Sequence, residues 1–154
     1  MAGHVLCTNG SSMMAFPRIH EDPIEQLSGS FGRMDGERLF AFILWAIPGD
    51  ASFDDGGKAV LESPIYIQCA GRADALTVEM REIGEAGRIR HYVLGRSAEV
   101  QGNCDITITW QRASTSIYHN EKWSAESAVG LFISYWKTGT VPPDVSRRQI
   151  DVGT

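Results

Sequence analysis

The sequence predicts an α+β domain, in which a mainly antiparallel β-sheet of about five strands is covered by a C-terminal helix and a short N-terminal helix. Strand-like segments follow one another at short intervals between residues 65 and 111, and short links join antiparallel neighbours. Residues 124–138 instead have the apolar spacing of an amphipathic helix. Because the strands lie between two helical segments, we expect the helices to pack on one face of the sheet.

The N-terminal part of the chain is expected to hold one short helix. Residues 1–20 look like a loose lead-in, with a turn or flexible stretch at residues 9–12. Asp22 can cap a helix that begins at Pro23, because an aspartate accepts from free backbone N–H groups and proline suits the first helical position. That helix runs towards Phe31.

Five segments have strand patterns. The first is a continuous apolar run, which is typical of a strand buried on both faces. In the third, Leu76 and Met80 lie on one face and Glu79 and Arg81 on the other. The predicted strands are residues 39–47, 65–69, 76–82, 89–95 and 105–111.

The C-terminal helix is well defined by its ends. Ser124 can cap it, and Gly139 followed by two prolines ends it. Phe132 and Trp136 share its apolar face, so we expect both to anchor the helix in the core.

Length, charge and cysteine content narrow the class of protein. A chain of 154 residues fits a single domain, 1–154. The net charge is −5, and residues 1–62 carry nine acidic and four basic residues, so we expect no direct binding of nucleic acid. No segment is apolar enough to span a membrane. Three widely spaced cysteines do not form a disulfide framework, which favours a cytoplasmic location.

Motifs for catalysis and metal binding are missing from the sequence. It contains no glycine-rich dinucleotide fingerprint, no P-loop, no CxxC or HExxH pattern and no GxSxG elbow. We therefore expect no catalytic residue, no metal site and no cofactor.

A protein-binding role instead directs attention to an acidic loop at residues 48–63. Loops on a rigid scaffold often carry function, and acidic rims steer basic partners. Exposed tryptophan is enriched at binding hot spots. The predicted partner-binding residues are Asp50, Asp54, Asp55, Glu62 and Trp110.

The C-terminal segment resembles a known family. Residues 124–128, Phe132 and residues 135–143 are similar to the closing signature of bacterial immunity proteins, above all of the Imm family numbered one. Residues 76–79 and 91–93 resemble the strands that precede it. The resemblance implies a cytoplasmic antitoxin of a polymorphic toxin system, which binds a cognate toxin domain and blocks its active site. The family's toxins include deaminases. The sequence also leaves open whether this chain forms a homodimer.

Two other classes of function also stay open. One is a small enzyme with a site on the sheet, which would use His91, Cys104 or the aspartates of residues 50–55. A thiolate needs a nearby base, and carboxylates can hold a hard cation. The other is a structural or oligomerising module that uses a sheet edge or a helix face.

Overall fold

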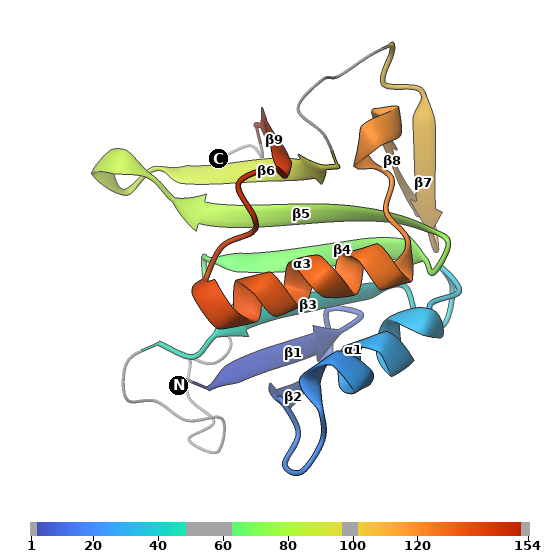
Figure 1. Ribbon diagram of the computed structural model, residues 1–154. Helices are drawn as coiled ribbons and strands as arrows, with labels where there is room; N and C mark the ends of the chain where they lie inside the picture. The colour runs from blue at the N-terminus through green and yellow to red at the C-terminus, as the bar shows by residue number, and fades with distance from the viewer. Residues whose placement is uncertain (1–2, 49–62, 97–101, 152–154) are drawn as a thin grey trace.

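The computed structural model describes residues 3–48, 63–96 and 102–151. It confirms the predicted α+β class, with an antiparallel sheet of seven strands (Figure 1). In their order across the sheet, the strands are β2 (Ser12–Phe16), β1 (His4–Thr8), β3 (Ala41–Ala46), β4 (Tyr66–Arg72), β5 (Ala75–Ile83), β6 (Ile89–Gly95) and β9 (Ser146–Ile150).

Two helices, α1 (Pro23–Gly32) and α3 (Ala125–Thr138), lie together on one face of this sheet (Figure 1). Both begin at the predicted caps. The Asp22 carboxylate accepts from the Glu25 N–H at 3.0 Å, and the Ser124 hydroxyl accepts from the Ser127 N–H at 3.3 Å. Gly139 ends α3 in the left-handed conformation, with φ of 77°.

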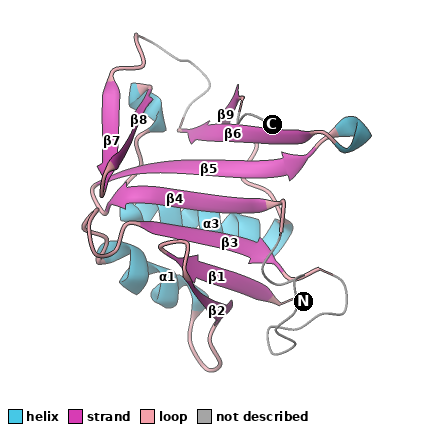
Figure 2. Cartoon of the chain, turned by 180° about the vertical axis from the view of Figure 1, so that it is seen from behind, coloured by secondary structure: helices cyan, strands magenta, loops and turns pink. Residues whose placement is uncertain are grey.

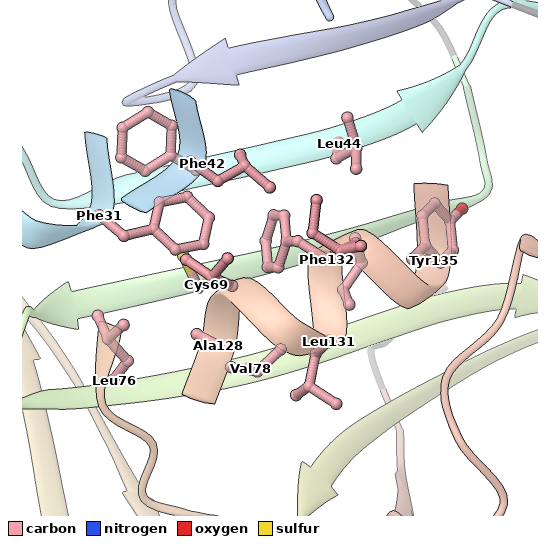
Figure 3. Packing of buried hydrophobic residues seen from close by; sticks show 14 of the residues in the cluster. Phe31, Phe42, Leu44, Cys69, Leu76, Val78, Ala128, Leu131, Phe132 and Tyr135 are labelled. Atoms are coloured by element: carbon pink, nitrogen blue, oxygen red, sulfur yellow. The ribbon is translucent and has the colours of Figure 1, made fainter. Parts of the chain in front are cut away.

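The main core lies between the helices and the sheet. Phe132 of α3 is fully buried at its centre, and its ring meets that of Phe31 edge to face at 4.8 Å between centroids (Figure 3). Phe31 in turn contacts Phe42 of β3 at 5.0 Å. These rings join both helices to the middle of the sheet. Trp136 is half-buried and packs on the edge of the same core.

The expected loose lead-in at residues 1–20 is wrong for its described part, because β1 and β2 form a hairpin there. Asn9 and Gly10 both have positive φ, 55° and 71°, as a type I′ turn requires. The Asn9 side chain also binds the segment before β3: its amide donates to the Arg38 carbonyl, and its oxygen accepts from the Phe40 N–H at 2.9 Å. The turn thus joins β1 to β2 and is also hydrogen-bonded to the segment before β3.

The strand predicted at residues 105–111 exists as β7 (Ile106–Trp110), but its expected place in the main sheet is wrong. It pairs with β8 (Ala113–Ile117) in a separate two-stranded sheet, and Gln111 turns between them with φ of 51°. The edge of β6 is occupied by β9 instead. Two short 3₁₀ helices, η2 (Glu85–Gly87) and η3 (His119–Glu121), complete the described elements.

Truncating Phe132 tests the helix–sheet core. Phe132→Ala should lower the free energy of unfolding by about 3–5 kcal/mol, because a fully buried ring leaves a cavity. Ile24→Ala, at a half-exposed position of α1, is the control and should cost less than about 0.5 kcal/mol. Denaturant unfolding measures both values. Equal losses would show that Phe132 is not the anchor.

A second stability prediction concerns Thr77 of β5. This residue is 1% exposed, and its hydroxyl has no hydrogen-bond partner among the described residues. Thr77→Val should raise the free energy of unfolding by about 1 kcal/mol, since it removes a buried polar group without a partner. Thr109→Val, at an exposed position of β7, should change it little. A destabilised Thr77→Val protein would contradict the prediction.

Candidate functional site

The sheet has a second face, which points away from α1 and α3 and is called the distal face below (Figure 2). Side chains alternate along each strand, so residues between those of the helix-side core point to it. On β5, for example, Val78 and Met80 belong to that core, and Glu79 and Arg81 therefore lie on the distal face. Tyr66 and Gln68 of β4 and His91 of β6 lie there by the same rule.

Four polar side chains form a row across β4, β5 and β6, called the ionic row below. Gln68 Nε2 donates to Glu79 Oε2 at 3.3 Å, and Glu79 Oε1 lies 2.8 Å from His91 Nε2. Arg81 Nε donates to His91 Nδ1 at 3.2 Å. A guanidinium only donates, so Nδ1 accepts and the ring proton on Nε2 is directed at Glu79. Both ring nitrogens of His91, which is 3% exposed, are thus engaged.

Tyr66 borders the ionic row. The Arg81 guanidinium stacks over its ring at 5.2 Å, and the His91 ring meets it edge to face at 6.2 Å. Burial raises the pKa of Tyr66, Arg81 opposes that rise and Glu79 adds to it. The phenol therefore stays protonated at neutral pH, and its ring face attracts the Arg81 guanidinium stacked on it.

A hollow of about 340 Å³ adjoins Tyr66 on the side of β1, β2 and β3. Its wall combines aromatic and aliphatic side chains with a few neutral polar groups. Burial raises the pKa of the Cys7 thiol, so the one sulfhydryl in the wall is a poor nucleophile. The lining residues are Cys7, Gly10, Ser11, Met13, Ile43, Trp45, Ser63, Tyr66 and Gln68.

Two isoleucines extend the apolar surface beyond the ionic row. Ile83 of β5 and Ile89 of β6 are direct cross-strand partners and are 46% and 51% exposed. They share the distal face with Arg81 and His91, because Ile83 follows Arg81 by two residues on β5 and Ile89 precedes His91 by two residues on β6. The distal face thus presents a hollow, a row of paired charges and an exposed aliphatic pair.

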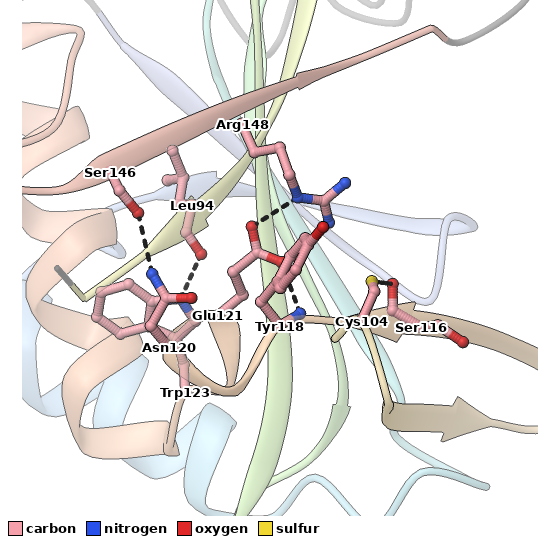
Figure 4. A network of polar contacts seen from close by, with 9 residues as sticks. All are labelled: Leu94, Cys104, Ser116, Tyr118, Asn120, Glu121, Trp123, Ser146 and Arg148. Atoms are coloured by element: carbon pink, nitrogen blue, oxygen red, sulfur yellow. Dashed lines mark hydrogen bonds and ion pairs between the residues drawn. The ribbon is translucent and has the colours of Figure 1, made fainter. Parts of the chain in front are cut away.

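A second polar network supports the scaffold. Glu121 of η3 is 1% exposed, and its carboxylate accepts from Arg148 Nε and Nη2 of β9, both at 2.9 Å (Figure 4). This pairing raises the pKa of Arg148, and the guanidinium also lies over the Tyr118 ring. The buried charge is fully paired, so the network attaches β9 and η3 to each other rather than offering a free group.

Of the partner-binding residues predicted from sequence, the structure describes the position of Trp110. Asp50, Asp54, Asp55 and Glu62 lie outside the described residues. Trp110 is half-exposed on β7 and packs on a small cluster of Val93, Ile108 and Ile117.

Cys104 and His91, two residues of the alternative enzyme site, have different hydrogen-bond partners, and the aspartates of residues 50–55 lie outside the described residues. The Cys104 thiol donates to the Ser116 carbonyl at 3.1 Å (Figure 4), and no hydrogen bond joins it to His91. No group of three or more His, Cys, Asp or Glu side chains in the described residues is placed to hold a metal ion.

The ionic row and the hollow were not predicted from sequence. The alternation of Glu79 and Arg81 with apolar residues on β5 was the available signal for the row. The hollow depends on β1 and β2, which were expected to be a loose segment. None of the helices in the described part of the chain has the length and apolarity to cross a bilayer.

Comparisons with protein-family models, with curated proteins and with solved structures find no match for this chain.

Proposed function

We propose that this protein is an immunity protein, which binds a cognate toxin domain through the distal face and blocks the toxin's active site. The C-terminal resemblance supplies the class of partner. The observation that supports a binding role is the hollow beside the stacked Tyr66–Arg81 pair.

The composition of the distal face suits protein recognition. Tyrosine, tryptophan and arginine dominate binding hot spots, and they act best in pockets that exclude water. Tyr66 and Trp45 line the hollow, which has room for an inserted side chain, and Arg81 stacks on the Tyr66 ring. The half-exposed Ile83 and Ile89 add apolar contact area at the far side.

The hydrogen bonding of the ionic row favours binding over catalysis. A general base needs a free lone pair within reach of a substrate proton. Both His91 nitrogens and both Glu79 oxygens already have partners within the row. Groups held in this way present fixed charges to a partner and lose little freedom when it binds.

Where a neighbouring gene encodes a toxin-like domain, substitutions on the distal face test this proposal against that domain. Tyr66→Ala and Arg81→Ala should each weaken binding by about thirtyfold, the effect of roughly 2 kcal/mol at a hot spot. Ile24→Ser, on the helix side, should leave affinity within about twofold. Titration calorimetry measures all three. If neither distal substitution changes the affinity, this face is not part of the interface. If the wild type forms no complex, the proposed function is rejected.

The acidic residues are a separate arm of the same experiment. A variant with Asp50, Asp54 and Asp55 changed to Asn should slow association and flatten its salt dependence, because rim charges steer the encounter. Stopped-flow mixing at low and high salt measures this rate. An unchanged association rate at low salt would leave these residues with a role in solubility only.

A further inference from the structure

The two outer strands of the sheet differ in how they are protected. Among the described residues, β2 has a strand neighbour on one side only, which is β1, and β9 has only β6. β9 carries Arg147 and Arg148, whereas the sequence of β2, Ser-Met-Met-Ala-Phe, has no charge. Natural sheets usually guard an outer strand with charges, proline or a cover, because its backbone can pair with another chain.

The ladder register shows which groups of β2 face outward. The Ile47 N–H donates to the Gly3 carbonyl, and the Asn9 N–H donates to the Ala41 carbonyl, at the two ends of the β1–β3 ladder. The backbone N–H and C=O groups of odd-numbered residues of β1 therefore point to β3, and those of even-numbered residues point to β2.

The even-numbered residues of β1 lie opposite Ser12, Met14 and Phe16 of β2. The backbone groups of these three β2 residues therefore form hydrogen bonds with β1. Met13 and Ala15 then direct their N–H and C=O groups away from the sheet. Both residues are exposed.

We propose that the outer edge of β2 pairs with β2 of a second copy of this chain, in an antiparallel and two-fold symmetric manner. With the axis at Met14, Met13 lies opposite Ala15 of the second copy, and each pair exchanges two backbone hydrogen bonds. The large Met13 side chain then neighbours a small alanine. The two sheets join into one, with their distal faces on the same side.

The difference between the two edges selects this symmetric pairing. A head-to-tail contact of β2 with β9 would repeat from copy to copy and give a ring or an open filament. It would also place the arginine-bearing β9 strand beside an uncharged one. Pairing of β2 with itself brings no like charges together and closes after two copies. This inference does not depend on the proposed function.

Proline at position 15 tests the edge directly. The Ala15 N–H is not used by β1, and proline is tolerated where an outer strand directs its N–H outward, so Ala15→Pro removes a donor from the dimer alone. Ala15→Val keeps that donor and is the matched control. In sedimentation equilibrium the wild type and Ala15→Val should have the mass of two chains, and Ala15→Pro the mass of one with an unchanged circular dichroism spectrum.

Amide hydrogen exchange on the wild type gives a second test that does not depend on the folding of a variant. Protection of the Met13 and Ala15 amides should rise with protein concentration. A wild type of single-chain mass, an Ala15→Pro protein that stays dimeric, or fast exchange of both amides at every concentration would overturn the proposal. Protection that appears only with the toxin domain would overturn it as well, and would assign the edge to that partner.

Discussion

The packing of Phe132 between Phe31 and the central strands is the interaction on which the arrangement of the molecule depends. It joins α1, α3 and the sheet in one apolar layer, with the two capped helices on the same face. Burial of large aromatic side chains contributes much of the stability of a core of this kind. Since both helices are used on one side, the distal face has to satisfy its polar groups and cover its apolar ones by other means.

Around the ionic row, the distal face meets this requirement through side-chain pairing. In the ionic row, the Glu79 carboxylate is flanked by Gln68 and His91, and Arg81 is held by His91 and the Tyr66 ring. Such pairing avoids the cost of isolated, partly desolvated charges. The hydrogen bond to His91 also orients Arg81, whose guanidinium stacks over Tyr66 in the wall of the hollow. A face that is ordered in this way for reasons of stability is also preorganised for a partner.

Local signals in the sequence predicted the helices and the central strands, and missed what depends on pairing. Asp22, Ser124 and Gly139 act within one turn of chain, so their roles could be read directly. The Asn-Gly pair at residues 9 and 10 was a hairpin signal that the expectation of a loose lead-in overlooked. The partner of β6 could not be predicted, because β9 lies some fifty residues further along the chain and has a polar sequence. The ionic row needs the register of three strands, which alternation alone does not give.

The residues that carry the family resemblance have structural roles in this fold. Ser124 caps α3, Ala128 and Phe132 are fully buried against the sheet, and Gly139 ends the helix. Each of these four is constrained by packing or capping, which gives it a structural reason to be there apart from any partner. Under the proposed function, the signature would therefore report a shared way of holding a helix on a sheet. Recognition of a particular toxin would depend on the distal face and the hollow, whose residues can change without disturbing that helix–sheet core.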